Sequence, residues 1–420
     1  MTFSATQGKT ARRKQFQNYR DLIRGFTRKT SPYNTLEASK KRLAFTADLF
    51  SRAYSDDETV VWRSSFVPTE LMYAMGFIPF PPETIVAMLA NAGFGSAVLA
   101  IAEDNYHLRD TCSFLRGTFG ASIRDCLPAP DFVACTSLYC DGSAKLFYQL
   151  AREYGRPYFF IDVPYHHERE RAVDYVARQL EEMVKEMERL SGVKCDPGKL
   201  SRAMEYSNQA RDYFTRVNDL RKTVPSPIYG GEAINYAAML SHTWGAKETV
   251  RIYELLCHEL EERVARKEPA VDGGEAHRVL WRNLKPYYSD YLMQYLEFDK
   301  RTVIAFEEAN CIHWNELDVQ DPFKGLARKM LSNPPLGVFE RWLEYTLRFL
   351  DDYSIEGVIE YAHWGCRHLN SGTQMLKDAL QERGIPLLII DGDCIDSRDY
   401  SEGQVRTRID AFIELLEVRS

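Results

Sequence analysis

The chain has 420 residues, 45% of them apolar, and a formal net charge of −7. This length exceeds what one hydrophobic core usually serves, so we expect two or three domains. No run of eighteen apolar residues occurs, which excludes a membrane-spanning helix. The first residues lack the apolar stretch of a secretory signal, and we expect a cytoplasmic protein.

The charge is distributed unevenly. Residues 1–42 hold eleven Lys or Arg and only two acidic residues. Such a basic arm can meet phosphates or an acidic partner, or resemble an organelle transit peptide, but a solvated amphipathic helix is the simpler interpretation. The acidic remainder of the chain argues against nucleic-acid binding.

The first part of the chain alternates strand and helix patterns. Residues 11–55 are predicted to form one or two helices. "TVVWRSSF" then predicts a short strand, and "PTELMYAMG" and "PPETIVAMLANAG" each predict a helix with Pro in the first turn and Gly at the end. "DFVACTS" predicts a buried strand, "DGSAKLFYQLAREYG" a helix and "RPYFFIDVP" another strand. This β-α-β order predicts a parallel sheet.

A helical region follows, from residue 168 to about 266. The segment "ERERAVDYVARQLEEMVKEMERL" places on one helix face the residues Val173, Val176, Leu180, Met183, Met187 and Leu190. "DPGKLSRAMEYSNQARDYFTRVNDLRK" predicts a second long helix. The polar segment "KEPAVDGGEA" contains Pro and a Gly pair, so we place a domain boundary there.

Alternation then resumes. Strands are predicted at "RVLW", "RTVIAFEE", "IEGVIEYA" and "IPLLIID", separated by helices that include "YYSDYLMQYLEF" and residues 371–383, and a helix at "GQVRTRIDAFIELLE" closes the chain. We therefore predict an α/β fold with two doubly wound, Rossmann- or flavodoxin-like parallel-sheet domains. The predicted boundaries are 1–55 for an N-terminal helical arm, 56–167 for the first α/β domain, 168–275 for a helical insert and 276–420 for the second α/β domain.

Nine cysteines occur, at positions 112, 126, 135, 140, 195, 257, 311, 366 and 394. An odd number in a large chain without a secretory signal argues against a disulfide scaffold. Four of them follow predicted strands, at the sheet edge where ligands bind in such folds: Cys140, Cys311, Cys366 and Cys394. Cys112 opens the helical pattern "CSFLRGTFG", and a helix N-terminus favours the thiolate.

These positions separate candidate ligands from core residues. Buried hydrophobes are the simplest interpretation of Cys135, Cys195 and Cys257, and Cys126 stays undecided. Metal ligation is favoured for Cys112, Cys140 and Cys366, although no CxxC motif supports it. Thiolates with few carboxylate neighbours suit an iron–sulfur cluster or zinc. Three thiolates and an open fourth position are typical of a catalytic rather than a structural centre.

Four segments carry a resemblance to a known family. They are "SSFVPTELMYAMGFIP", "DTCSFLRGTFG", "CDGSAKLFYQL", and the stretch from "HWGCRHLNSGTQM" through "DGDCIDSRDYSEGQVRTRIDAFIE". From about residue 60 to the end, the chain resembles the 2-hydroxyacyl-CoA dehydratase and benzoyl-CoA reductase family, and its tail resembles the D-component, substrate-binding subunit. The central helices match loosely, and residues 1–55 match no known pattern.

The resemblance implies an oxygen-sensitive [4Fe-4S] cluster, held between two α/β domains by Cys112, Cys140 and Cys366. The fourth iron position takes water, hydroxide or the thioester carbonyl of an acyl-CoA substrate. A separate ATP-hydrolysing iron–sulfur activator protein injects one electron, and the resulting ketyl radical expels the 2-hydroxyl, loses a β-proton and returns the electron. The net reaction converts a (R)-2-hydroxyacyl-CoA to the enoyl-CoA. A paralogous subunit or a second copy of the chain is expected as a partner.

The absence of other motifs is compatible with this activity. No GxxxxGK[ST] motif occurs, so ATP hydrolysis is expected on another protein. No GxGxxG follows a strand, so no nicotinamide cofactor is expected.

Several polar residues are candidates for supporting roles. His363 and His368 flank Cys366 and can move protons near neutral pH, or can be hydrogen-bonded residues at the rim. Ser64 and Ser65 end the first predicted strand, where a hydroxyl can touch the open iron or the thioester oxygen, or can cap the next helix. Arg398, Arg406 and Arg408 can meet CoA phosphates, although solvated helix charges are the simpler interpretation.

Three alternatives remain open. The first is a low-potential reductase of the same family, acting on an aromatic acyl-CoA or holding an [8Fe-9S] double-cubane cluster that also uses Cys126 and Cys311. One cysteine pair expected for the double cubane is missing where this chain reads "ARKMLSNPPLG". The second is a non-catalytic partner subunit, and the third is a zinc-bound structural or binding protein.

Overall fold

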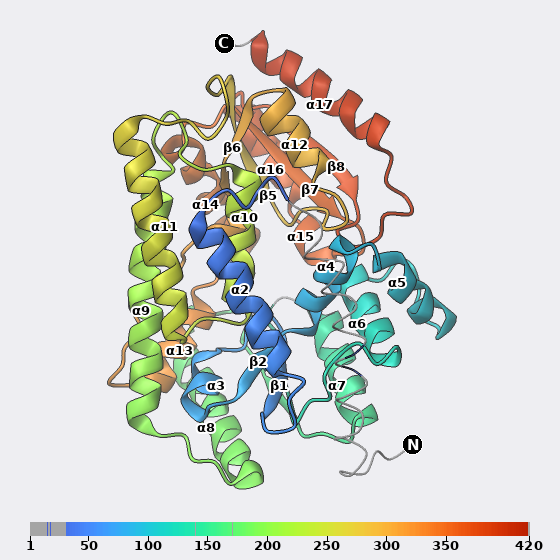
Figure 1. Cartoon of the computed structure of the whole chain (residues 1–420), viewed down its shortest axis with the longest axis vertical. Coiled ribbons are helices and arrows are strands. Elements are labelled where there is room, and N and C mark those ends of the chain that lie inside the picture. The colour runs from blue at the N-terminus through green and yellow to red at the C-terminus, as the bar shows by residue number, and fades with distance from the viewer. Residues whose placement is uncertain (1–14, 16, 18–30, 139, 170, 419–420) are drawn as a thin grey trace.

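Two four-stranded parallel sheets organise the molecule (Figure 1). The computed structural model describes residues 15, 17, 31–138, 140–169 and 171–418. The first sheet has the order β2-β1-β3-β4, with β1 (Val60–Arg63), β2 (Ile78–Phe80), β3 (Phe132–Thr136) and β4 (Tyr158–Ile161). The second has the order β6-β5-β7-β8, with β5 (His277–Arg282), β6 (Thr302–Glu307), β7 (Gly357–His363) and β8 (Leu387–Gly392).

Both sheets use the same strand order, counted from their own first strand. In each, the chain moves outward from the first strand in one direction and then crosses it to build the other side. The order therefore reverses between β1 and β3 in the first sheet and between β5 and β7 in the second. Ligands of doubly wound sheets bind at such switch points, outside the carboxyl ends of the strands. The prediction of two doubly wound α/β domains is confirmed.

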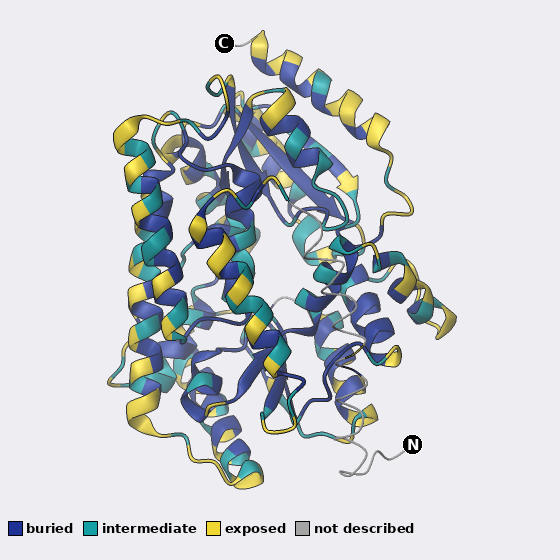
Figure 2. Ribbon diagram, in the orientation of Figure 1, coloured by how far each residue is buried: buried dark blue, intermediate teal, exposed yellow. Residues whose placement is uncertain are grey.

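The strands form where the sequence has short, nearly continuous apolar runs. β1, β3 and β7 lie inside their sheets and are buried along their whole length, as expected for strands covered by helices on both faces. Figure 2 shows the same burial in the inner strands, whereas exposed residues lie on the outer faces of the helices, in loops and in the edge strands β4 and β8.

The first domain contains two elements that the sequence did not predict. Its helices are α3 (Glu70–Met75), α4 (Pro82–Asn91), α5 (Gly95–Asp104), α6 (Ser113–Ile123) and α7 (Asp141–Glu153). β2 is only three residues long and contains Pro79, which a sheet tolerates because β2 is an edge strand. α5 begins with the small residues Gly-Ser-Ala and lacks a strong helical start signal.

Long helices connect the two sheets. They are α8 (Ala172–Ser191), α9 (Pro197–Leu220), α10 (Gly230–Ala237), the 3₁₀ turn η1 (Ala238–Ser241) and α11 (Lys247–Arg266). α9 and α11 stand side by side along one side of the molecule (Figure 1). The predicted apolar face of α8 is buried except at its ends, where Val173 is half-buried and Leu190 is 41% exposed. These helices share one hydrophobic core with residues of the first sheet and of α13 (Pro322–Leu331).

The second domain departs from the predicted helix pattern at one place. Its remaining elements are α12 (Tyr291–Gln294), η2 (Tyr295–Asp299), η3 (Glu308–Asn310), α14 (Phe339–Asp352), α15 (Arg367–Asn370), α16 (Thr373–Glu382) and α17 (Glu402–Glu417). The helix predicted from "YYSDYLMQYLEF" starts only at Tyr291, and its last turn is a π-helix. The wider turn accompanies the inward position of Glu297, whose carboxylate accepts hydrogen bonds from the backbone of Gly230 and Gly231 at 2.7 and 3.0 Å.

The predicted N-terminal arm is described only in part. It forms α2 (Glu37–Arg52), while the residues before 31, other than Gln15 and Gln17, lie outside the described part of the chain. α2 is attached to the connecting helices through Glu259, which accepts the N–H groups of Glu37 and Ala38 at 2.8 and 2.9 Å. Within the described residues, no helix is both long and apolar enough to cross a membrane.

A buried charge network holds the centre of the second sheet. Arg282, at the end of β5, donates to Glu360 of β7 at 3.0 Å, and both side chains are fully buried. The same guanidinium donates to Glu308 at 3.0 Å and lies 4.6 Å above the ring of Trp342. Because both carboxylates depend on one cation, removing that cation leaves two buried negative charges without compensation.

Arg282→Met is therefore expected to destabilise the chain by about 3–5 kcal/mol. The measurement is the urea midpoint of unfolding. The matched control is Arg189→Met, because Arg189 pairs with Glu186 while 67% of its side chain is exposed, and its loss is expected to cost at most about 0.5 kcal/mol. Equal midpoints for the two variants would refute a structural role for the Arg282 network.

Candidate functional site

The three predicted cysteine ligands each precede a helix. Cys140 lies between β3 and α7, at the switch point of the first sheet, and Cys366 lies between β7 and α15, at the switch point of the second. Cys112 precedes α6 on the crossover from β2 to β3. Each is the N-cap residue of its helix, so each sulfur lies beside unpaired backbone N–H groups.

The two domains touch backbone to backbone beside Cys112 and Cys366. Gly365 has a left-handed backbone with φ of 74°. A Cβ atom added there would lie 2.8 Å from the Cys112 nitrogen and 2.9 Å from the Thr111 carbonyl carbon. Both the conformation and the lack of space require glycine at this position. The turn that carries Cys366 is thus pressed against the turn that carries Cys112.

The turn that carries Cys140 contacts the elements that follow the other two cysteines. A Cβ atom added at Gly142 would lie 2.7 Å from Leu115, in the first turn of the helix that follows Cys112. Asp141 forms an ion pair at 3.1 Å with Arg367, the residue after Cys366. The structure therefore brings together the neighbourhoods of all three predicted ligands, which come from distant parts of the sequence.

The pKa shifts of the three cysteines agree with their closeness. Burial raises the pKa of Cys112 first, and the nearby Cys366 and Cys140 raise it further. Burial likewise raises the pKa of Cys366, and that of Cys140 to about 11. Backbone N–H groups oppose these shifts without reversing them, and one of them donates from Ser143 to the Cys140 sulfur at 3.2 Å. Three thiolates in this place need a positive centre, which a metal cluster supplies.

The spacing of donor groups bears on the kind of metal centre. Across the described residues, no three His, Cys, Asp or Glu side chains lie close enough to share one metal ion. A closed zinc site requires four donors at about 2.0–2.3 Å from a single ion. In an iron–sulfur cubane, by contrast, each thiolate binds a different iron. The described residues therefore do not form a closed single-zinc site.

His363 lies inside the site and is buried. Its Nε2 atom is 3.4 Å from the Cys112 sulfur, and its Nδ1 atom is 3.2 Å from the backbone nitrogen of Cys394. Burial lowers the pKa of this imidazole, against the opposing charge of Asp393. His368, the other predicted histidine, stacks on Trp342 with ring centroids 6.3 Å apart.

The two serines after β1 do not cap the next helix. α3 begins at Glu70, and its N-cap residue is Thr69, so the capping alternative for Ser64 and Ser65 is wrong. The Ser64 hydroxyl instead accepts the N–H group of Thr136 at 3.3 Å and thereby joins the ends of β1 and β3. Ser65 follows it at the same switch point and is half-buried.

Of the remaining candidate cysteines, Cys126 and Cys311 lie away from the site, whereas Cys394 lies within it. Cys126 follows the end of α6 opposite to Cys112, and an eleven-residue helix is roughly 16 Å long. Cys311 follows the edge strand β6, two strand positions from β7 and so roughly 10 Å away across the sheet. The structure therefore does not bring Cys126 to the other cysteines, which weakens the double-cubane alternative. Cys394 is fully buried beside His363.

The structure reveals one acidic residue that the sequence interpretation missed. Glu83 lies in the first turn of α4, just after the edge strand β2. Its Oε1 atom accepts the hydroxyl of Ser143, the residue whose N–H group donates to the Cys140 sulfur. Its Oε2 atom is buried and, among the described residues, has no hydrogen-bond partner. Burial raises the pKa of Glu83 to about 7, although the Arg63 guanidinium opposes the shift. In the sequence, an acidic residue in a first helical turn is common and carries no functional signal.

The loop between β8 and α17 joins the second domain to the first. Asp393 accepts the hydroxyl of Ser113 at 2.6 Å. Arg398 pairs with Glu103 at 2.5 Å and with Asp396 at 2.6 Å. The charge of Arg398 is thus already matched by carboxylates within the chain, and the predicted contact with CoA phosphates is not supported for this residue. Arg408 likewise donates to the backbone carbonyl of Ile389.

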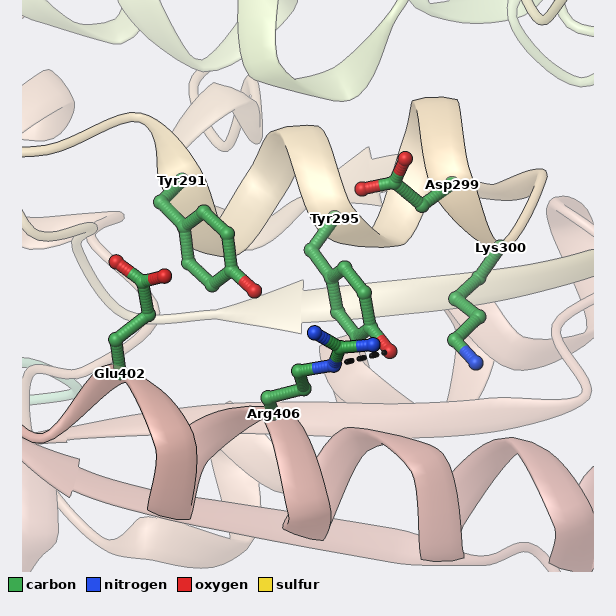
Figure 3. Close-up of a pocket in the computed structure, with 6 residues that line it drawn as sticks. All are labelled: Tyr291, Tyr295, Asp299, Lys300, Glu402 and Arg406. Atoms are coloured by element: carbon green, nitrogen blue, oxygen red, sulfur yellow. Dashed lines mark hydrogen bonds between the residues drawn. The ribbon is translucent and has the colours of Figure 1, made fainter.

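Arg406 lies in a surface hollow of about 440 Å³, which Figure 3 shows in close-up. The hollow is lined by Tyr291, Tyr295, Asp299, Lys300, Glu402 and Arg406, from α12, η2 and the residues after it, and α17. The Arg406 Nε atom donates to the Tyr295 hydroxyl at 3.2 Å, and Lys300 pairs with Asp410 at 2.6 Å. No cysteine lines the hollow, so it is separate from the site described above, and a phosphate contact of Arg406 stays a prediction.

The Gly365 contact predicts a specific mutational effect. Gly365→Ala forces a methyl group against the Cys112 backbone and is expected to lower both the urea midpoint and the amount of iron that the chain binds after reconstitution. The control is Gly155→Ala, where φ is 60° but no atom lies within 4 Å of the added Cβ. That variant carries only the backbone strain, about 1–2 kcal/mol, and is expected to bind iron as the parent does. Equal iron binding by both variants would contradict the proposed convergence.

Comparison with known proteins is consistent with this site. The family model described as 2-hydroxyglutaryl-CoA dehydratase, D-component, matches residues 64–416. The chain is 27% identical over 371 residues to the (R)-phenyllactyl-CoA dehydratase alpha subunit of Clostridium sporogenes, covering 86% of this chain and 90% of that protein. It is 26% identical over 382 residues to the (R)-2-hydroxyisocaproyl-CoA dehydratase alpha subunit of Clostridioides difficile (88% and 92%). It is 24% identical over 426 residues to a benzoyl-CoA reductase subunit of Thauera aromatica (93% and 97%). The chain therefore belongs to the 2-hydroxyglutaryl-CoA dehydratase D-component family.

Proposed function

We propose that this chain is the cluster-bearing component of a radical (R)-2-hydroxyacyl-CoA dehydratase, with a [4Fe-4S] cluster held by Cys112, Cys140 and Cys366. The observation that carries the proposal is the meeting of these three turns, from two separate sheets, at the switch points where such folds bind ligands. When bound, such a cluster offers one iron without a protein ligand, which can bind an oxygen of the substrate and transfer a single electron to it.

The chain's own residues provide the environment for that chemistry. The three cysteine side chains are half-buried where the two domains meet. The Ser143 N–H group donates a hydrogen bond to the Cys140 sulfur, and Cys112 and Cys366 likewise stand at the N-terminal ends of helices. Ser65 lies at the switch point of the first sheet, and we assign its hydroxyl to the thioester oxygen of the substrate.

Glu83 is the proposed proton carrier. Dehydration removes a hydroxyl group as water and a proton from the β-carbon, so a group that both takes up and releases protons is required. A carboxyl group whose pKa lies near 7 does both at neutral pH. Both ring nitrogens of His363 already have partners, whereas the Glu83 Oε2 atom has none among the described residues.

The proposed substrate and partner subunit rest on the names of the relatives. Those relatives are named as alpha subunits of dehydratases that act on phenyllactyl-CoA, 2-hydroxyisocaproyl-CoA and lactoyl-CoA. We therefore propose an acyl-CoA thioester as the substrate and a second, related subunit as a partner. Electron injection by an ATP-hydrolysing iron–sulfur activator is part of the same proposal, because the chain itself has no P-loop motif.

Reduction of an acyl-CoA is the second candidate function. It is favoured by the alignment to the benzoyl-CoA reductase subunit of Thauera aromatica, which covers 93% of this chain. The two functions differ in their products. A dehydratase converts (R)-phenyllactyl-CoA to an enoyl-CoA and water without net electron consumption, whereas a reductase consumes electrons and converts benzoyl-CoA.

Cluster loading tests the ligand assignment directly. After anaerobic reconstitution with iron and sulfide, the parent chain is expected to hold about four of each per chain. Cys112→Ala, Cys140→Ala and Cys366→Ala are each expected to reduce this content sharply. Cys195→Ala is the control, because Cys195 lies in the loop between α8 and α9. Bound zinc in place of iron, or three variants that load fully, would contradict the proposal.

The assay of function uses the loaded chain together with a related subunit and an activator. We expect enoyl-CoA to form from at least one of (R)-phenyllactyl-CoA, (R)-2-hydroxyisocaproyl-CoA and (R)-lactoyl-CoA. Electron-dependent conversion of benzoyl-CoA, with no turnover of these three, would favour the reductase instead.

Glu83→Gln is predicted to separate proton transfer from cluster binding. The variant is expected to load iron as the parent does but to lose most of its dehydration rate, since the amide cannot exchange a proton. In the metal-free parent, the raised pKa means that the stability contributed by the neutral carboxyl is full below pH 4 and is lost as pH rises through 7. The free energy of unfolding of the parent is therefore expected to fall between pH 5 and pH 8 by about 2–3 kcal/mol more than that of the variant. An unchanged rate would refute the role of Glu83.

A further inference from the structure

The hydrogen bonds of His363 fix which ring nitrogen carries the proton. Its Nδ1 atom lies 3.2 Å from the backbone nitrogen of Cys394. A backbone amide nitrogen donates and does not accept hydrogen bonds, so Nδ1 must be the acceptor and carries no proton. The neutral imidazole then has its proton on Nε2.

This proton points at a proposed cluster ligand. The Nε2 atom lies 3.4 Å from the Cys112 sulfur, so the ring donates to that sulfur. His363 is 1% exposed, and a hydrogen bond in such a place competes little with water. The contact also joins the domains, because His363 ends β7 of the second sheet and Cys112 belongs to the first domain.

Neighbouring groups hold the ring in this orientation. The Phe114 ring packs against it edge to face, with centroids 5.6 Å apart. The His363 carbonyl accepts the side-chain amide of Asn370 at 3.0 Å. Cys394 itself follows β8, which pairs with β7 as far as His363 and Gly392. The sheet register therefore places the Cys394 N–H group where Nδ1 meets it.

From this geometry we propose that His363 is a positioning residue, which donates a hydrogen bond from Nε2 to the Cys112 sulfur and thereby raises the reduction potential of the bound cluster. The inference rests on the proposed function. Hydrogen bonds to the sulfur ligands stabilise the reduced, more negative form of an iron–sulfur cluster. A backbone donor already serves Cys140, and His363 adds a side-chain donor for Cys112.

Two amide variants separate the hydrogen bonds of the ring. The Gln side chain places an N–H group near the position of Nε2, so His363→Gln keeps the donor to Cys112. The Asn side chain reaches only the position of Nδ1, so His363→Asn keeps the acceptor for Cys394 but loses the donor to Cys112. In reconstituted protein, we expect the midpoint potential of His363→Gln to lie near that of the parent and that of His363→Asn to be more negative. Equal potentials in the parent and His363→Asn, with four irons bound in both, would overturn the inference while leaving the proposed function intact.

A second readout uses the metal-free chain and does not depend on the cluster. Loss of an N–H donor lowers the share of Cys112 present as thiolate, so its alkylation by iodoacetamide slows by about threefold for each tenfold loss of thiolate. We expect this slowing in His363→Asn and not in His363→Gln, with the rate at Cys140 as the internal reference. Equal Cys112 rates in both variants would overturn the hydrogen bond itself. A parent chain that binds no cluster but shows the expected difference in rates would refute the proposed function and retain the hydrogen bond.

Discussion

The turn at Gly365 packs its backbone directly against that of Thr111 and Cys112, and the position of the site depends on this contact. The contact joins two sheets that are otherwise separate in sequence and in hydrogen bonding. Because it involves backbone atoms, it fixes the distance between the turns independently of side-chain rotamers. The cysteines on either side of it, Cys112 and Cys366, are thereby held in one place.

The repeated strand order explains why the proposed cysteine ligands come from both domains. Each sheet has a switch point between its first and third strands, and the chain leaves the third strand through a turn into a helix. Cys140 occupies this turn in the first sheet, and Cys366 occupies it in the second. Two similar sheets whose switch points face a common space thus provide equivalent cysteine positions, and Cys112 adds a third from the neighbouring crossover.

Much of this architecture was predictable from sequence because it depends on local patterns. Apolar runs located seven of the eight strands, and their ends located Cys140 and Cys366 at the rim. The edge strand β2 was missed, since three residues containing Pro79 do not resemble a strand without the sheet beside them. The π-turn at Glu297 was missed because its cause is a contact with Gly230 and Gly231, far away in the sequence.

The functional details were harder to predict because they also depend on contacts between residues that are far apart in the sequence. The pattern of residues identified His363 but not its two hydrogen bonds, which depend on the register of β7 and β8. Glu83 resembled an ordinary first-turn acid until the fold placed it beside Ser143 and buried one of its oxygens. Arg398 was open to two interpretations, a solvated helix charge or a phosphate ligand, until the structure paired it with Glu103 and Asp396. Tertiary contacts, rather than local propensity, decide these roles.

The same tertiary contacts bear on how a cluster is acquired. Ser113 with Asp393 and Glu103 with Arg398 join the domains next to the cysteines. A cluster at the proposed site would require the release of protons from three half-buried thiols whose pKa values are raised. Metal binding to such thiols must become more favourable as pH rises, because each bound thiolate has lost its proton. In this fold, the domain contacts supply the geometry of the site, and the proposed metal centre would supply the charge that its sulfurs require.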